Sequence, residues 1–311
     1  MSSLISLRTI IVYTLPIITL IGLFTNSLSF MIFSRKRFDK TIFSTYMRCF
    51  ILIQTLNLIL PINRFLELNL NLYFSRISDF CCKLRNVFSH IFLANSAWLL
   101  AVISFDRYLS VSYPNRYLFR KKVKFQVITC FCVIAFNFTT LSPNWLYYLN
   151  ETNITNQSFL IPSTCVSLSI WLDTLELFQL CINPFFFMIL FTFLTIKNVL
   201  KSRNKINQKT NGQSTFKQND RKFVISSISI NICFLLLNFP HFFLKIIKEY
   251  TKLFDNLKDL FALLQTIFLF LLYINLISTF LVQYLVNSIF KSEFDNFLFR
   301  NRISLKKKNK R

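Results

Sequence analysis

The amino-acid sequence predicts an all-α membrane protein, in which a seven-transmembrane helix bundle is followed by a short amphipathic eighth helix. Three observations predict this fold. Hydrophobic residues make up 53% of the 311 positions, with 39 Phe against only 2 Gly, which is too apolar for an ordinary soluble domain. Seven long runs are almost free of charge. Basic residues gather in short clusters between these runs, as expected of loops at a membrane surface.

Each of the seven runs is long enough to cross the hydrocarbon core, which takes about 20 residues of helix. Arg48 is the only Lys, Arg, Asp or Glu residue inside them. Because backbone groups in lipid must find partners within their own segment, each run is predicted to be a helix that its prolines kink but do not end. The first run is too long for a signal peptide and lacks a cleavage site. The runs cover residues 9–33, 41–62, 86–105, 125–150, 177–196, 223–244 and 260–290.

The distribution of Lys and Arg predicts which helix ends face the cytoplasm. The loops after the first, third and fifth spans and the C-terminal tail, together with Arg48 near the start of the second span, hold 27 of these residues, and the other segments hold 9. Because basic residues stay cytoplasmic, we expect a multi-pass plasma-membrane protein with an extracellular N-terminus and a cytoplasmic C-terminus. The expected parts are a short extracellular N-terminus (1–8), the transmembrane domain (9–290), and an amphipathic helix with a basic cytoplasmic tail (291–311).

The loop after the fourth span supports this orientation. Its stretch "LNETNITNQSF" contains three Asn-X-Ser/Thr sites, at Asn150, Asn153 and Asn156, and glycan acceptors must face the lumen. Chance matches are the alternative, because the chain is rich in Asn, Ser and Thr. Three sites within seven residues of the one loop without Lys or Arg favour glycosylation. A fourth match, at Asn137, lies inside the fourth predicted helix and is expected to stay unmodified.

The composition also argues against other classes of protein. A net charge of +23 could suit nucleic acid, but the basic residues do not line a soluble face, so we expect a lipid bilayer as partner and no nucleic acid. His90 and His241 lack a catalytic set beside them. With only Gly22 and Gly212, no glycine-rich phosphate loop is possible. We therefore predict no enzymatic activity, no cofactor and no metal.

Two of the 8 Cys residues occupy informative positions. Cys82, with Cys81 beside it, opens the third span on the outer side, and Cys165 lies in the outer loop after the fourth span. Because the outside is oxidising, a disulfide between Cys82 and Cys165 is predicted. A free thiol, or a bridge from Cys81 in place of Cys82, remains open.

The motif "DRY", Asp106 to Tyr108, stands at the inner end of the third span. In a seven-helix chain with an outer N-terminus, this motif resembles that of the rhodopsin-like (class A) G-protein-coupled receptors, and the resemblance extends over roughly residues 9–300. Further positions match motifs of that family: Cys82, which lies 25 residues before Arg107; Asn26 in "GLFTNS"; Pro114 in the second inner loop; the kink prolines Pro184 and Pro240; and Phe234 of the transmission switch.

The resemblance implies a mechanism. An Arg at the membrane edge is costly unless it is paired, and Asp106 would hold Arg107 in the resting state. An extracellular ligand would bias a two-state bundle, in which the sixth helix swings outward and opens a cytoplasmic cleft for a heterotrimeric G protein. The alternative is that the two residues are only interfacial anchors. The predicted activation switch comprises Asp106, Arg107, Tyr108, Pro184, Phe234 and Pro240.

Several positions depart from the family. Gln54 stands in place of the Asp that anchors an internal sodium ion, Asn238 in place of the toggle Trp, and Thr192 in place of a Tyr in the fifth span. In "NLISTFLVQY", Gln283 replaces the usual Tyr if Asn275 is the first Asn of the motif, whereas a shifted alignment would supply Tyr284. The predicted internal polar network comprises Asn26, Gln54, Ser96 and Asn275.

The ligand is predicted from two absences and one surface. Ser89 stands where amine receptors carry an Asp, and residues 260–290 contain no Lys for retinal. A rim of mixed charge at the outer helix ends suits a peptide, and the pattern looks most like invertebrate neuropeptide receptors of the FMRFamide type. The predicted ligand pocket comprises Ser89, Asn238 and His241.

Two other functions stay open. The lost motifs of the sixth and seventh spans are compatible with a chemosensory or decoy receptor that binds without the usual coupling. A transporter or channel is disfavoured, because the spans contain almost no ionisable residues and no internal repeat. After the seventh span, one helical face carries Phe290, Phe294, Phe297 and Leu298, which predicts an amphipathic helix on the inner leaflet.

Overall fold

The computed structural model describes residues 2–39, 42–69, 79–113, 122–150, 165–167, 170–206, 215–250 and 258–308. Within these residues, seven helical segments are long and apolar enough to cross a membrane, which confirms the predicted bundle. The segments are Thr9–Phe33, Phe43–Leu66, Lys83–Ser112, Val123–Leu141, Thr174–Lys201, Lys222–Ile247 and Leu260–Val286. The protein is therefore a multi-pass membrane protein.

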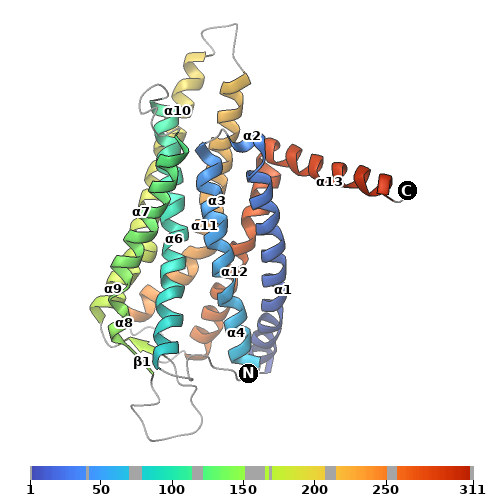
Figure 1. The fold of residues 1–311 in the computed structure, drawn as a ribbon. Coiled ribbons are helices and arrows are strands. Elements are labelled where there is room, and N and C mark those ends of the chain that lie inside the picture. The colour runs from blue at the N-terminus through green and yellow to red at the C-terminus, as the bar shows by residue number, and fades with distance from the viewer. Residues whose placement is uncertain are drawn as a thin grey trace, which may run out of the picture.

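The bundle has two ends, which are used below as landmarks (Figure 1). The N-terminal end is where α1 (Ser2–Phe33) begins, and the α13 end is where α2 (Lys36–Asp39) and α13 (Ser288–Lys308) lie. The remaining elements, in chain order, are α3 (Ile42–Asn57), α4 (Ile59–Asn69), α6 (Asp79–Ser112), α7 (Val123–Leu141), α8 (Asn144–Tyr147), β1 (Tyr148–Asn150), β2 (Cys165–Ser167), α9 (Ile170–Leu177), the π-helix η3 (Phe178–Ile182), α10 (Asn183–Ile206), α11 (Thr215–Tyr250) and α12 (Lys258–Val286).

Prolines interrupt two of the spans, as predicted, without ending them. The second span divides into α3 and α4 because Pro61 has no N–H to donate to the carbonyl of Asn57, and its ring crowds that carbonyl. The fifth span contains η3, in which the N–H of Asn183 donates to the carbonyl of Phe178, five residues earlier. This π-helix lies directly before Pro184, which also lacks an N–H donor. Such π-bulges are frequent at functional sites.

The fourth span is shorter than the sequence indicated. The apolar run was expected to continue to residue 150, but α7 ends at Leu141, two residues before Pro143. The rest of the run forms α8 and β1, which pairs with β2 as an antiparallel hairpin, Asn150 opposite Cys165. The absence of charge alone could not separate these residues from the helix, because residues 142–150 contain no Lys, Arg, Asp or Glu.

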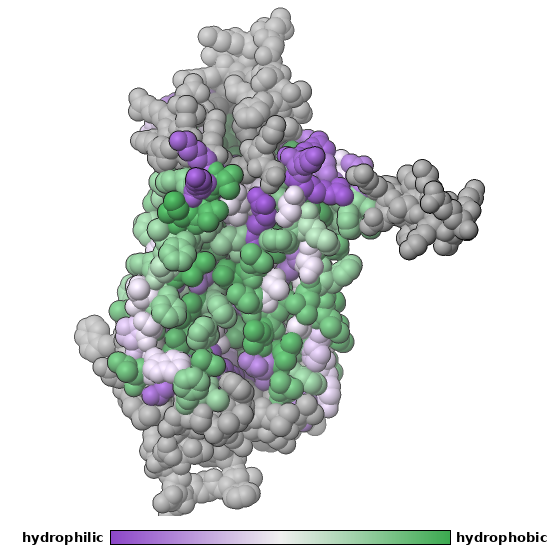
Figure 2. All heavy atoms as spheres, in the orientation of Figure 1, coloured by the Kyte–Doolittle hydropathy of each residue, from purple (hydrophilic) through white to green (hydrophobic). Residues whose placement is uncertain are grey.

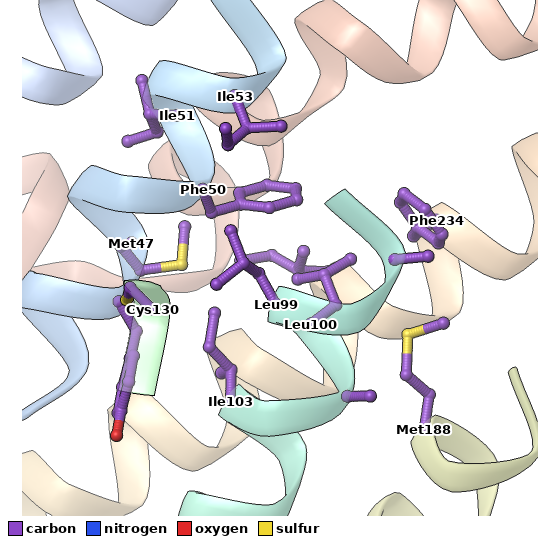
Figure 3. Packing of buried hydrophobic residues seen from close by; sticks show 14 of the residues in the cluster. Met47, Phe50, Ile51, Ile53, Leu99, Leu100, Ile103, Cys130, Met188 and Phe234 are labelled. Carbon is purple, nitrogen blue, oxygen red and sulfur yellow. The ribbon is translucent and has the colours of Figure 1, made fainter. Parts of the chain in front are cut away.

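The core lies around α6, which contacts four of the other spans. Figure 3 shows Phe50 of α3 near Leu99 and Leu100 of α6, and Phe234 of α11 and Met188 of α10 beyond α6. On the visible face of the molecule, hydrophobic residues cover the middle and hydrophilic residues gather toward the α13 end (Figure 2). Large apolar side chains are exposed on the spans, including Phe131, Phe193 and Leu236, as a lipid-facing surface requires.

The amphipathic helix is confirmed as α13, which projects away from the bundle (Figure 1). Phe290 is fully buried, and its ring lies 5.3 Å from that of Phe33 and 5.7 Å from that of Phe280. Glu293 forms ion pairs with Arg35 (3.2 Å) and Arg37 (3.1 Å). The start of α13 is therefore fastened to the connection after α1.

Gly22 marks a close contact between α1, the second span and α12. A Cβ atom at this position would lie 2.6 Å from Leu58 Cδ2 and 2.9 Å from Ile277 Cγ2. We expect Gly22→Val to destabilise the protein by about 1–3 kcal/mol, the usual cost of overpacking. The thermal unfolding midpoint of the detergent-solubilised protein measures the effect. An unchanged midpoint would contradict this close contact, and Leu23→Val, at an exposed neighbour, is the control.

Candidate functional site

Asp106 and Arg107 form a buried ion pair near the α13 end of α6. The Arg107 Nη2 atom donates to the Asp106 Oδ2 atom at 2.8 Å, and the side chains are 8% and 5% exposed for Arg107 and Asp106. The Arg107 guanidinium also lies over the ring of Phe43, 5.4 Å from its centroid. Removing one partner of such a pair leaves a buried charge uncompensated, at a cost of about 3–5 kcal/mol. The adjacent acid and base are therefore more than interfacial anchors.

The other residues of the predicted switch lie on α6, α10 and α11. Tyr108 is half-buried and stacks on Phe191 of α10, with ring centroids 6.0 Å apart. Phe234 of α11 is buried and meets Phe185 of α10 edge-on at 6.0 Å. Pro184 lies just after η3, and Pro240 lies inside α11. Pro114 lies outside the described residues.

The predicted internal polar network is only partly assembled. Ser96 accepts a hydrogen bond from Asn57 Nδ2 at 2.9 Å, a partner that the sequence analysis did not name. Asn26 and Gln54 are both buried, and within the described residues their amide atoms make no hydrogen bond. The Asn275 Oδ1 atom accepts a hydrogen bond from Ser278 Oγ of its own helix, at 3.5 Å. The amide of Gln54 therefore does not replace a charged anchor for these helices.

The predicted pocket residues make hydrogen bonds mostly within their own helices. Ser89 Oγ donates to the carbonyl of Arg85, and Asn238 Nδ2 donates to the carbonyl of Phe234. His241 is half-buried, and its ring meets that of Phe242 edge-on. An ion cluster lies near these residues, toward the N-terminal end of the bundle. The sequence did not predict this cluster.

This ion cluster consists of Glu176, His90 and Lys245, which come from α9, α6 and α11. The Glu176 Oε2 atom lies 3.0 Å from His90 Nδ1, and Oε1 accepts from Lys245 Nζ at 2.8 Å. The carboxylate is 0% exposed, whereas His90 and Lys245 are 22% and 31% exposed. The Glu176 carboxylate is therefore buried, whereas the His90 imidazole and the Lys245 ammonium are partly exposed. The cluster also joins three helices. Each residue lies near a predicted pocket position, but their mutual contact depends on how the helices are rotated.

Two further polar contacts join α11 to its neighbours near the α13 end. Asn231 Nδ2 donates to Ser104 Oγ at 2.6 Å and to Thr192 Oγ1 at 3.0 Å. Ser226 Oγ donates to Gln283 Oε1 at 2.7 Å. Thr192 stands in place of a family tyrosine, and Gln283 does so if Asn275 is the first Asn of the motif in the seventh span.

The structure also distinguishes the roles of Gln283 and Tyr284. Gln283 is fully buried and faces α11 through Ser226. Tyr284 is half-buried and packs on Phe280 and Phe294, at 6.2 and 5.6 Å between ring centroids. Gln283 therefore occupies the interior position, while Tyr284 supports α13.

A third buried contact joins α6, α7 and η3. Asn137 Nδ2 donates to Asn95 Oδ1, and Asn137 Oδ1 accepts from Gln179 Nε2, both at 2.8 Å. The Trp98 indole N–H donates to the carbonyl of Gln179 at 3.0 Å. Asn137 is 0% exposed, so its glycosylation match is buried in the bundle as expected.

The remaining predicted sites fall largely outside what the structure describes. Cys82 lies on α6 and Cys165 in β2, and the backbone of β2 contacts α6. Their side chains lie outside the described part of the chain, so the disulfide stays a prediction. Asn150 ends β1, while Asn153 and Asn156 lie outside the described residues.

Comparisons with known proteins agree with this arrangement. The model of the family "7 transmembrane receptor (rhodopsin family)" matches residues 25–278, which is well over half of the chain. The human N-arachidonyl glycine receptor is 25% identical over 232 residues, a match that covers 70% of this chain and 65% of that receptor. With seven spans, a buried Asp-Arg pair on the third of them and this family match, the chain belongs to the rhodopsin family of seven-transmembrane receptors and is not an enzyme.

Proposed function

We propose that this receptor passes the signal of an extracellular ligand, a peptide, across the plasma membrane to a heterotrimeric G protein. The observation that carries the proposal is the buried Asp106–Arg107 pair at 2.8 Å. Such a pair has two alternative states, because the guanidinium either stays with Asp106 or turns to a partner that enters at the α13 end. A ligand that binds one of two states more tightly shifts the equilibrium between them.

The proposed orientation places the α13 end in the cytoplasm and the N-terminus outside. It is supported by the 27 Lys and Arg residues, Arg48 included, in the segments assigned to the α13 end, against 9 in the segments assigned to the other end, because basic loops stay cytoplasmic. The same orientation places Cys165 and the acceptor sites at Asn150, Asn153 and Asn156 outside. We therefore also propose the Cys82–Cys165 disulfide and glycosylation of this loop.

The ion cluster of Glu176, His90 and Lys245 supports a charged ligand, as a peptide would be. It lies near the proposed outer ends of three helices, one of which, α11, also packs beside the switch. A peptide brings charged groups that can exchange with these ion pairs. The resemblance to FMRFamide-type receptors supports the same ligand class.

A second candidate is a non-peptide ligand that carries a carboxylate. A receptor related to this chain is named for N-arachidonyl glycine, a lipid whose glycine ends in a carboxylate. The cluster presents Lys245 and His90 and hides Glu176, which favours an approaching anion. A panel of neuropeptides, with N-arachidonyl glycine and its neutral methyl ester, separates the candidates by second-messenger output. Activation by the acid but not by the ester favours the lipid.

A third candidate, a chemosensory or decoy receptor, is favoured by the replaced motif residues Gln54, Asn238 and Gln283. Such a receptor would bind ligand without activating a G protein. Ligand binding without any second-messenger response in the unaltered receptor would favour this candidate over the first two.

The central test is Arg107→Ala. Charge-assisted hydrogen bonds contribute about 1.5–3 kcal/mol each, so we expect ligand-evoked G-protein activation to fall at least about tenfold at equal surface expression. Lys124→Ala, at an exposed lysine of the same bundle end, is the control and should signal normally. Undiminished activation by Arg107→Ala would argue against the proposed switch.

A further inference from the structure

The half of α11 nearest the α13 end carries two buried polar side chains that contact other helices. Asn231 is 2% exposed and Ser226 is 0% exposed. In this half of α11 the neighbouring positions are largely apolar, so van der Waals packing alone could seal the helix against the bundle. Polar groups at these two buried sites instead add directional contacts, which are made in one helix arrangement and lost in another.

Asn231 joins α11 to two helices at once. Its Nδ2 atom donates to Ser104 Oγ on α6 at 2.6 Å and to Thr192 Oγ1 on α10 at 3.0 Å. Ser104 lies three residues before Arg107, which is about one helical turn. The contact therefore joins α11 to α6 and α10 about one helical turn away from Arg107.

The Ser104 hydroxyl, which accepts a hydrogen bond from Asn231, can lose that bond at little cost in free energy. Ser104 Oγ also donates to the carbonyl of Leu100 in its own helix at 2.7 Å, so its donor stays satisfied when Asn231 leaves. The amide of Asn231 would then be hydrated as α11 moves outward. A buried group that keeps one partner avoids most of the penalty for an unmade hydrogen bond. Such a contact holds one arrangement of α11 while leaving another accessible.

Ser226 makes the second contact, toward α12. Its hydroxyl donates to Gln283 Oε1 at 2.7 Å, and the same oxygen accepts from Asn287 Nδ2 at 3.1 Å. Asn287 Oδ1 in turn accepts the N–H groups of Ile289 and Phe290, which begin α13. Ser226 therefore connects α11 to the residues that set the direction of α13.

We propose that these two contacts form a polar latch that holds α11 in the closed arrangement. Asn231 and Ser226 are its positioning residues on α11, with Ser104, Thr192 and Gln283 as their acceptors. The latch rests on the proposed function, in which α11 moves outward to admit a G protein. In the closed state, Thr192 and Gln283 accept hydrogen bonds from side chains of α11. This role differs from that of the tyrosines that the family carries there.

Asn231→Leu tests the latch, because it keeps the side-chain size and removes the amide. A net hydrogen bond shifts an equilibrium about twofold to tenfold, so losing two should raise basal G-protein signalling per surface receptor by at least about fourfold. Thr192→Val should raise it about twofold or more, and Asn231→Leu/Thr192→Val should not exceed Asn231→Leu alone, because both remove the same contact.

A matched serine pair tests the second half of the latch. Ser226→Ala removes the bond to Gln283 and should raise basal signalling about twofold or more. Ser227→Ala is the control, since Ser227 is 2% exposed on the same helix and the structure gives it no bond to another helix among the described residues. If Asn231→Leu fails to reach the surface, Thr192→Val and Ser226→Ala decide the result instead.

A direct measurement of α11 separates the latch from G-protein coupling. Spin labels at Lys222→Cys on α11 and Lys124→Cys on α7, with exposed Cys132 replaced by Ser, report the distance between these helices in lipid nanodiscs without G protein. Longer distances with Asn231→Leu support the latch, and longer distances without basal signalling support it while contradicting the proposed coupling. Unchanged distances overturn the latch, whatever the signalling, because a merely structural Asn231 would lower expression only.

Discussion

Lys245→Met is expected to destabilise the folded receptor by about 3–5 kcal/mol, the usual cost of breaking a buried ion pair on one side. The substitution keeps the apolar stem of the side chain and removes the ammonium group, which lies 2.8 Å from Glu176. Because the Glu176 carboxylate is 0% exposed, loss of the ammonium leaves a buried negative charge with less compensation, part of which comes from His90 at 3.0 Å. Surface expression and the thermal unfolding midpoint of the solubilised receptor measure the loss.

A double variant shows whether the charge of Glu176 causes this loss. Glu176→Gln/Lys245→Met removes both charges and retains an amide that can hydrogen-bond His90, so it should recover much of the stability lost in Lys245→Met. Lys197→Met, at an exposed lysine of α10, should have little effect. A double variant as unstable as Lys245→Met would show that the ammonium acts by packing and not by neutralising Glu176.

The fold was largely predictable because lipid allows few solutions. A charge-free run of about 20 residues has to be a helix, so the seven spans follow from composition along the chain. Errors arose where this constraint ends. Residues 144–150 are uncharged but form α8 and β1, because they lie beyond Pro143 and are no longer obliged to continue a helix.

The candidate site was predictable only where its partners are close in sequence. Asp106 and Arg107 are adjacent, and their pairing followed from the sequence. Lys245 and Glu176 are 69 positions apart, and Asn231 and Ser104 are 127 apart. Their contacts depend on the rotation of each helix about its axis, which small differences in packing decide and which hydrophobic periodicity does not determine in a nearly uniform apolar span.

These contacts hold α11 at two places along its length. Lys245 holds it near the N-terminal end, while Asn231 and Ser226 hold it near the α13 end, and Pro240 lies between these two regions. Pro240 has no N–H to donate to the carbonyl of Leu236, which makes this part of the helix easier to bend. Rearrangement of the ion cluster can therefore be transmitted along α11 to the polar latch. Elements with two discrete arrangements are what carries coupling between distant sites.

Asp106→Asn is expected to raise basal signalling strongly. Asn matches the shape of Asp but removes its charge, which leaves the Arg107 guanidinium, buried at 6% exposure, without its anionic partner. Opening would return this group to water or to a G protein and so relieve the cost of a buried unpaired charge. Relief of even about 3 kcal/mol of that cost would change the ratio of open to closed receptor on the order of 100-fold. A shift of about 5.5 kcal/mol would take a receptor from 1% to 99% open, so a mostly closed receptor should become substantially open. Second-messenger output per surface receptor without ligand measures the effect. Asp106→Asn/Arg107→Ala should be silent, because in the proposed switch the freed Arg107 engages the G protein. Basal output equal to that of the unaltered receptor in Asp106→Asn would show that the pair does not hold the closed state.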